Sequence, residues 1–171
     1  SVFLITGAFF LLFGFYLSYI RYSPKSLAFE TTQTETGVTH ANLPKILKID
    51  SVNIVLPIIP SKITGRNWET TPNGVSFLAQ SAIPGSTGNS VFYGHNWSSV
   101  LGNLIRVKPG DSIEITMDNG KKYMYEAEYV ATVEPTQTSV INDTGDTRIT
   151  IYTCTGFLDT KRFVVVAKPK N

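Results

Sequence analysis

Residues 148–168 read RITIYTCTGFLDTKRFVVVAK, and the pattern of this stretch decides which fold is expected. Two runs rich in β-branched residues, Arg148–Thr153 and Arg162–Lys168, are typical of buried strands. Only the seven residues Thr155–Lys161 connect them, and so short a connection favours antiparallel neighbours. Cys154 would then stand beside Arg162 at the mouth of the connecting loop.

Upstream of these two strands, short apolar runs alternate with turn residues. The turn Asp118-Asn119-Gly120 predicts a tight hairpin, and Leu101–Ile105 could form one helical turn. The sequence therefore predicts an all-β barrel or sandwich with about eight strands. The six further strands are expected at Lys45–Ile49, Asn53–Ile58, Val75–Leu78, Ser90–Tyr93, Ser112–Met117 and Tyr123–Val133.

The amino-terminal segment differs from the rest. Residues 2–20 read VFLITGAFFLLFGFYLSYI and contain no charge. A helix of this length spans roughly 28 Å, close to the apolar thickness of a bilayer. Tyrosines gather near its end, as interfacial aromatic residues do. A transmembrane anchor over residues 2–20 is predicted in preference to a buried core helix or a cleaved signal peptide.

A linker is predicted over residues 21–42, which are rich in Thr and lack apolar periodicity. His40 lies in this segment and is expected to be solvated. Arg21 and Lys25 follow the apolar run, and by themselves they would favour a cytoplasmic location for what comes next.

Composition excludes several classes of protein. The net charge of +2 is too small to indicate nucleic-acid binding, and a charged fraction of 16% with 42% hydrophobic residues argues against disorder throughout. One cysteine rules out an intrachain disulfide framework and a zinc site built from several thiolates. With only two histidines, a His-rich metal site is not expected, and no cofactor is predicted.

Three residues could carry chemistry together. Cys154 ends a strand and precedes a Thr-Gly turn, Arg162 opens the next strand, and His95 closes the strand SVFYGHN. A cysteine nucleophile needs a proton acceptor, and a guanidinium could favour the thiolate and oppose negative charge on a reacting oxygen. Each residue also has a structural interpretation: a buried small hydrophobe, a strand-edge arginine and a hydrogen-bonded histidine. Spacing alone does not place His95 beside Cys154.

Three segments taken in order, SVFYGHNW, ITIYTCTG and KRFVVVAKP, resemble the sortases, the cysteine transpeptidases of Gram-positive and related bacterial surfaces. The family's Thr-Leu-x-Thr-Cys strand end reads Thr150-Ile151-Tyr152-Thr153-Cys154 here, with Ile in place of the commoner Leu. Residues 101–127 are also similar to the family's middle region. The resemblance covers about residues 43–169.

The resemblance implies a closed eight-stranded sortase β-barrel with short helices over residues 43–171. It implies that Cys154 attacks the carbonyl after the Thr of an LPxTG-like sorting signal and forms a thioester acyl-enzyme. His95 would transfer protons, and Arg162 would bind substrate and stabilise the oxyanion. An amine of a peptidoglycan precursor or a pilin lysine would take the acyl group. The domain would be extracytoplasmic, held at the membrane by residues 2–20.

The resemblance also suggests where a sorting signal binds. In sortases the connection that corresponds to Glu134–Thr147 helps form the signal groove. Its apolar residues could touch the signal, or could fold onto the core instead. The expected substrate-binding residues are Val140 and Ile141 of this loop, with Thr153 and Asn96 beside the expected catalytic residues. No lid is predicted, because residues 23–42 lack the Asp-Pro or aromatic plug of pilin-type enzymes.

The resemblance also raises the possibility of calcium at the same loop, because some sortases bind it there. Glu134, Asp143 and Asp146 are the acidic residues available. Three scattered acids on a loop are more often simply solvated, so calcium is a minor expectation.

Other functions fit the sequence less well. An L,D-transpeptidase places Arg two residues after its Cys, where this chain has Gly156, and a papain-like protease places its Cys at a helix start. A non-catalytic, membrane-tethered β-domain for adhesion or scaffolding is the alternative from a different class. Such a domain would have no need of Cys154, His95 and Arg162 together.

Overall fold

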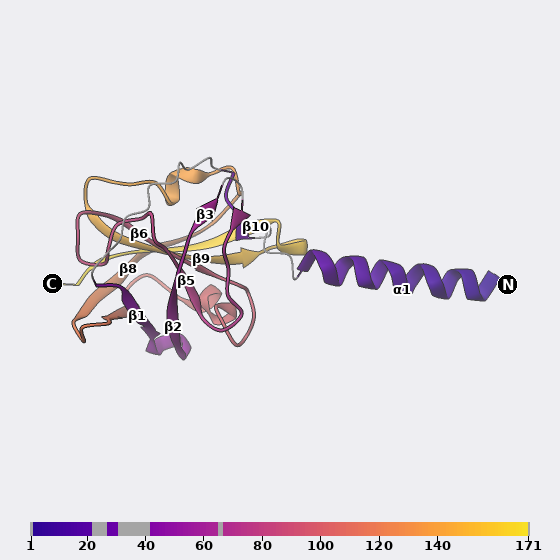
Figure 1. The fold of residues 1–171 in the computed structure, drawn as a ribbon, viewed down its shortest axis with the longest axis horizontal. Coiled ribbons are helices and arrows are strands. Elements are labelled where there is room, and N and C mark those ends of the chain that lie inside the picture. Colours follow the sequence, from indigo (N-terminus) through magenta and orange to yellow (C-terminus); the bar gives the residue numbers. More distant parts are fainter. Residues whose placement is uncertain (1, 22–26, 31–41, 65–66, 171) are drawn as a thin grey trace.

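An α-helix precedes a closed β-barrel in the computed structural model, which describes residues 2–21, 27–30, 42–64 and 67–170 (Figure 1). The helix α1 spans Val2–Arg21. The barrel confirms the predicted fold class, and all eight predicted strands form with small shifts at their ends. In barrel order the strands are β1 (Pro44–Ile49), β2 (Ile54–Ser61), β5 (Val75–Leu78), β6 (Gly88–Gly94), β9 (Thr147–Thr155), β10 (Lys161–Pro169), β8 (Lys122–Val133) and β7 (Ser112–Met117).

Short elements fill the connections between the strands. The predicted turn Asp118–Gly120 joins β7 to β8, and Gly120 takes the positive φ of +83° that glycine tolerates. The two-stranded sheet of β3 (Ile63–Thr64) and β4 (Asn67–Trp68) was not predicted. The 3₁₀ helices are η2 (Asp50–Val52), η3 (Gly102–Arg106), which confirms the expected helical turn, η4 (Thr138–Val140) and η5 (Phe157–Asp159).

The pairing of β9 with its neighbours organises one side of the barrel. β9 runs antiparallel to β10, as predicted, and parallel to β6. In these registers Cys154 lies opposite Arg162, and Thr153 lies opposite Gly94. The carboxyl ends of β6 and β9 and the start of β10 therefore meet at one end of the barrel.

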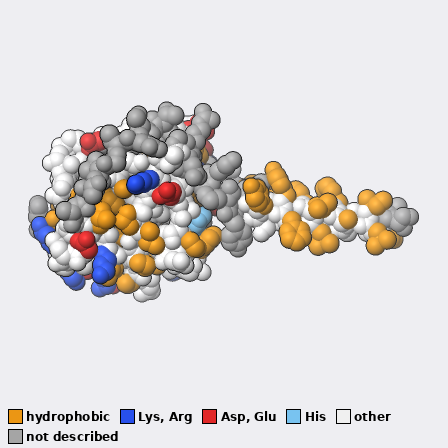
Figure 2. Space-filling model, viewed as in Figure 1, with side chains coloured by type: hydrophobic (Ala, Val, Ile, Leu, Met, Phe, Trp, Pro, Cys, Tyr) orange, Lys and Arg blue, Asp and Glu red, His pale blue; other side chains and the backbone are white. Residues whose placement is uncertain are grey.

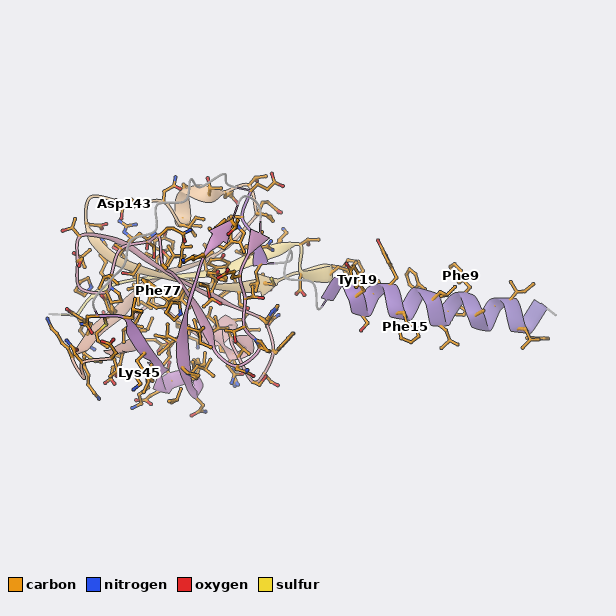
Figure 3. All side chains as sticks on the ribbon, viewed as in Figure 1. Phe9, Phe15, Tyr19, Lys45, Phe77 and Asp143 are labelled. Carbon is orange, nitrogen blue, oxygen red and sulfur yellow. The ribbon has the colours of Figure 1, made fainter. Side chains whose placement is uncertain are left out.

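Strand β9 is buried on both faces, which is why its sequence is apolar almost throughout. Alternate residues such as Ile149 and Ile151 face the barrel interior, to which every barrel strand contributes and in which Phe77 lies (Figure 3). The residues between them face a second apolar cluster outside the barrel, called here the outer cluster. Its buried members are Leu27, Phe29, Ile63, Trp68, Leu78, Val91, Tyr93, Val133, Ile141, Tyr152, Cys154, Val164 and Val166.

Helix α1 extends away from the barrel, and its apolar side chains, among them Phe9, Phe15 and Tyr19, are exposed (Figures 2 and 3). It contacts the barrel domain near η5. The predicted helix is therefore present. Judged by length and hydropathy, however, none of the helices in the described ranges qualifies as a membrane span.

The division into barrel interior and surface predicts a stability difference between two isoleucines. Ile151 is fully buried in the barrel, so Ile151→Ala should lower the free energy of unfolding by about 2–5 kcal/mol. Ile105 is 48% exposed, and Ile105→Ala should cost less than about 1 kcal/mol. Urea unfolding of both variants measures this, and equal losses would contradict the assignment of Ile151 to the core.

Candidate active site

Three adjacent strands bring the candidate residues to one end of the barrel. Cys154 is the second-last residue of β9 and pairs directly with Arg162 of β10, so the predicted neighbourhood of these two residues is confirmed. Because Gly94 lies opposite Thr153 in the parallel β6–β9 pair, His95 leaves β6 at the level of Cys154. His95 and Arg162, which lie 59 and 8 positions from Cys154 in the sequence, are therefore brought to the same end of the barrel.

All three residues are buried. The exposed fraction is 2% for Cys154, 3% for Arg162 and 6% for His95. Cys154 belongs to the outer cluster, so its thiol lies on the outer face of the sheet among apolar and aromatic side chains. Charge–dipole and hydrogen-bond interactions are stronger in such low-dielectric surroundings than in water.

The imidazole of His95 is held by its own loop. The indole of Trp97 stacks on it with ring centroids 4.3 Å apart and an interplanar angle of 7°. The main-chain N–H of Leu101 donates to the His95 carbonyl over 3.1 Å. Burial lowers the pKa of His95, and the negative charge of Asp159 opposes that shift in part. A neutral imidazole near pH 7 can accept a proton.

The guanidinium of Arg162 is fixed by main-chain carbonyls. Nη1 donates to the carbonyls of Asp159 and Lys161, each at 3.0 Å, and Nη2 donates to the carbonyl of Ala28 at 2.8 Å. Among the described residues, Nε finds no acceptor although it is buried. Arg162 thus presents a buried, partly unsatisfied donor beside Cys154, which suits the binding of a substrate oxygen.

The expected substrate-binding residues divide into two groups. Ile141 lies in the outer cluster with Cys154, Val140 packs against it, and Asn96 is half-buried directly after His95. Thr153 does not fit the expectation, because its hydroxyl donates to the Gly94 carbonyl over 2.8 Å and no part of its side chain is exposed. It is one residue from Cys154 in a strand and so points to the opposite face.

The loop that carries Val140 and Ile141 is held in place by one buried amide. Nδ2 of Asn89 donates to the carbonyls of Val140 and Asn142, each at 3.1 Å. Its Oδ1 accepts from the Thr150 hydroxyl at 2.9 Å. The loop is thereby fixed against β6 and β9, on the side where Ile141 reaches the outer cluster.

Tyr152 was not among the predicted site residues, yet it shares the outer face with Cys154. Its ring stacks on that of Tyr93, with centroids 5.6 Å apart, and its hydroxyl donates to the Leu27 carbonyl over 3.2 Å. Burial raises the pKa of Tyr152 well above its ordinary value, so the phenol remains a donor. The two-residue period of a strand could have identified it, since it lies two positions before Cys154.

The acidic residues considered for calcium are mostly engaged in ion pairs. Asp146 pairs with Arg148 at 2.6 Å, and hydrogen bonds from Arg148 lower the pKa of Asp146. Glu134 pairs with Lys161 at 3.3 Å. Within the described ranges, no group of three His, Cys, Asp or Glu side chains is placed to hold a metal ion. Calcium binding stays a prediction.

Comparison with known proteins gives consistent matches. The sortase domain family matches residues 47–170. Sortase A of Bacillus anthracis is 32% identical over 123 residues, which are 70% of this chain and 56% of that protein. Sortase A of Listeria monocytogenes serovar 1/2a is 34% identical over 108 residues, 61% of this chain and 48% of that protein. The chain thus spans about half the length of the curated relatives it matches.

Solved structures agree in fold. The crystal structure of Listeria monocytogenes sortase A matches with a TM-score of 0.62 and 28% identity, over 77% of this chain and 89% of that chain. Sortase A from Corynebacterium diphtheriae matches with a TM-score of 0.66 and 23% identity, over 91% of this chain and 82% of that chain.

The surroundings of His95 predict its titration. Its pKa should lie below 6.5, and Asp159→Asn should lower it further because the opposing charge is removed. The unfolded chain then binds more protons than the folded chain below pH 6.5, so the free energy of unfolding should fall as the pH drops through that value. NMR titration in a His40→Gln background measures the His95 pKa. Asp118→Asn, in the exposed β7–β8 turn, is the control; a His95 pKa unmoved by Asp159→Asn would contradict the prediction.

Proposed function

This chain belongs to the sortase family, and on that premise we propose that it is a cysteine transpeptidase that cleaves an LPxTG-like sorting signal after its Thr and transfers the acyl group to an amine. The observation that carries the proposal is the strand register around β9. That register sets Cys154 opposite Arg162 and brings His95 to the same level. A nucleophile, a proton carrier and an anion-stabilising donor are the three groups that acyl transfer requires.

The first half of the reaction forms a thioester. The thiol proton of Cys154 passes to the neutral imidazole of His95. The resulting thiolate sulfur attacks the carbonyl carbon of the signal's Thr, and a C–S bond forms. The Thr–Gly C–N bond breaks as His95 gives its proton to the departing amine. Arg162 hydrogen-bonds the carbonyl oxygen while that oxygen carries negative charge.

The second half of the reaction transfers the acyl group from Cys154 to an amine, and His95 now accepts a proton. An incoming amine attacks the thioester carbonyl, His95 takes the proton that the amine loses, and the sulfur of Cys154 leaves as thiolate. The thioester keeps the acyl group activated, so no nucleotide is needed. Hydrolysis competes with this step, and the burial of Cys154 within the outer cluster supports a site that limits access of water.

Two acceptors have the required chemistry: the amine of a peptidoglycan precursor and the lysine of a pilin. Proteins that carry a carboxy-terminal sorting signal would be the acyl donors. A non-catalytic tethered domain is less well supported, because it gives no reason to bury an arginine with an unsatisfied Nε beside a cysteine.

The transpeptidase proposal predicts a covalent intermediate. The chain, incubated with LPxTG-like peptides and an added amine, should show an acyl adduct by intact mass and an amine-capped peptide product. Cys154→Ala should show neither. His95→Ala and Arg162→Ala should each lower kcat/KM by about 10²- to 10⁴-fold.

Arg106→Ala is the matched control for Arg162→Ala, since Arg106 is an exposed arginine of η3. It should keep full activity. If no peptide forms an adduct and Cys154 also resists alkylation in the folded protein, the non-catalytic alternative is favoured instead.

The surface location of sortases leads to a second proposal, that α1 and the neighbouring η5 attach this chain to the membrane. Residues 2–20 carry no charge, and Phe157 of η5, 84% exposed, extends the apolar surface of the helix. The chain should therefore co-sediment with phospholipid vesicles, and a variant without residues 2–20 should stay in the supernatant. Equal sedimentation of the two would contradict attachment through α1.

A further inference from the structure

The loop that follows His95 closes into a hydrogen-bonded turn around two rings. The carbonyl of His95 accepts from the main-chain N–H of Leu101 at 3.1 Å. The carbonyl of Trp97 accepts from the N–H groups of Val100 and Gly102, at 2.9 and 2.8 Å. A side chain at Gly102 would not fit this turn, because its Cβ would lie 2.8 Å from the carbonyl carbon and oxygen of Trp97. The main chain therefore fixes the imidazole and the indole relative to one another.

The indole of Trp97 lies face to face with the imidazole of His95. The ring centroids are 4.3 Å apart, the interplanar angle is 7°, and Trp97 also packs against the apolar side chains of the barrel interior. The face of an aromatic ring is negative, and a cation within about 6 Å of the centroid of a tryptophan is attracted to it. The indole thus presents its negative face to the ring that becomes positive when His95 accepts a proton.

A proton on His95 needs such support, because the other groups around the imidazole compensate its charge poorly. His95 is 6% exposed, so water solvates the imidazolium little. Within the described ranges no carboxylate forms an ion pair with His95, and Asp159 of η5 acts on it through space. Arg162, at the same end of the barrel, carries a charge of the same sign as the imidazolium. Direct contact with the ring comes from the indole of Trp97.

We propose that Trp97 is a positioning residue for His95: its indole orients the imidazole and, by a cation–π contact, stabilises the imidazolium that forms when Cys154 gives up its proton. The S–H bond of Cys154 breaks, an N–H bond forms on His95, and a thiolate–imidazolium pair results. The part of the proposal that concerns the reaction rests on the proposed function. A desolvated cation–π contact should strengthen proton binding to His95 by about three- to ten-fold.

The direction of one change separates this role from that of a simple apolar cover. Burial lowers the pKa of His95, so a cover that acted by burial alone would weaken proton binding. Removing such a cover would admit water and strengthen proton binding. Removing a cation–π contact has the opposite effect, because the imidazolium loses the negative face of the indole.

The first test is an NMR titration of His95 in His40→Gln/Cys154→Ala protein, in which no other histidine and no thiol titrates. Adding Trp97→Leu should weaken proton binding to His95 by about three- to ten-fold. Trp97→Phe keeps an aromatic face over the imidazole and should stay within about two-fold of the parent protein. Proton binding that is unchanged or stronger in Trp97→Leu would overturn the proposal.

The matched control removes a different aromatic ring that faces a cation. Nζ of Lys121 lies 4.5 Å from the centroid of the Tyr123 ring, at the β7–β8 turn. Tyr123→Leu should leave proton binding to His95 unchanged, and circular dichroism confirms that each variant is folded. A fall in Tyr123→Leu equal to that in Trp97→Leu would show a general loss of structure and overturn the assignment to Trp97.

A second test keeps the shape of the ring, in case Trp97→Leu does not fold. Fluorinated tryptophans are introduced at position 97 alone, where the fluorine atoms withdraw electron density from the face of the indole. Proton binding to His95 should weaken with each fluorine atom added, because the attraction depends on the negative charge of that face. Proton binding that does not depend on fluorination would overturn the cation–π contact.

The kinetic consequence is tested with LPxTG-like peptide in protein that keeps Cys154. Trp97→Leu should lower kcat by about three- to ten-fold with KM unchanged, because less of the thiolate–imidazolium pair forms. A raised KM with unchanged kcat would place Trp97 in substrate binding and overturn its role toward His95. The NMR titration needs no peptide, so weaker proton binding in Trp97→Leu without any peptide product from the parent protein would reject the proposed function and leave the contact between Trp97 and His95 standing.

Discussion

The register of β9 between a parallel and an antiparallel neighbour is the constraint on which the site depends. Parallel pairing with β6 brings the ends of two strands to the same edge, and antiparallel pairing with β10 returns the chain to that edge within a few residues. A slip of one residue in either pairing would turn Cys154 or its partner toward the barrel interior. The barrel closure fixes both registers at once, so the positions of His95, Cys154 and Arg162 are a property of the whole sheet.

The same sheet also surrounds the site with apolar side chains that are separate from the barrel interior. The barrel interior stabilises the fold, while the outer cluster provides a separate low-dielectric environment around the cysteine. Trp97 covers the imidazole, main-chain carbonyls hold the guanidinium, and the buried amide of Asn89 holds the loop that brings Ile141 to the cluster. Each polar group is oriented before any ligand arrives, which is the condition for electrostatic stabilisation of a transition state.

The barrel strands could be predicted because each is a short apolar stretch bounded by turn residues. The pairing of Cys154 with Arg162 followed from the short connection between their strands. Thr153 was expected to bind substrate, but the alternation of side chains along a strand places it on the face opposite Cys154, and the same alternation would have drawn attention to Tyr152. The short pairing of β3 with β4 involves only two residues on each strand, too few for alternation to be visible.

The packing of residues 27–30 onto the barrel could not be predicted from sequence patterns for a different reason. Leu27 and Phe29 are two apolar residues in a Thr-rich segment, and their contacts with Tyr152 and Arg162 span more than a hundred residues. No periodicity in the local sequence predicts such a contact. The apolar run at residues 2–20 was correctly predicted as a helix, but its predicted membrane crossing is not supported by the length and hydropathy of the helices in the described ranges.

The long separation in sequence between residues 27–30 and their partners Tyr152 and Arg162 also has a consequence for how the chain folds. Residues 27–30 are synthesised early, yet the surface that receives them exists only after β6, β9 and β10 have paired. Contacts between residues so far apart in the sequence form late and slowly, because the intervening chain must close into a loop before the contacts contribute to stability. Residues 27–30 therefore leave the ribosome before the barrel strands yet dock only after those strands have paired, and until then the thiol of Cys154 is more open to oxidants than in the finished fold.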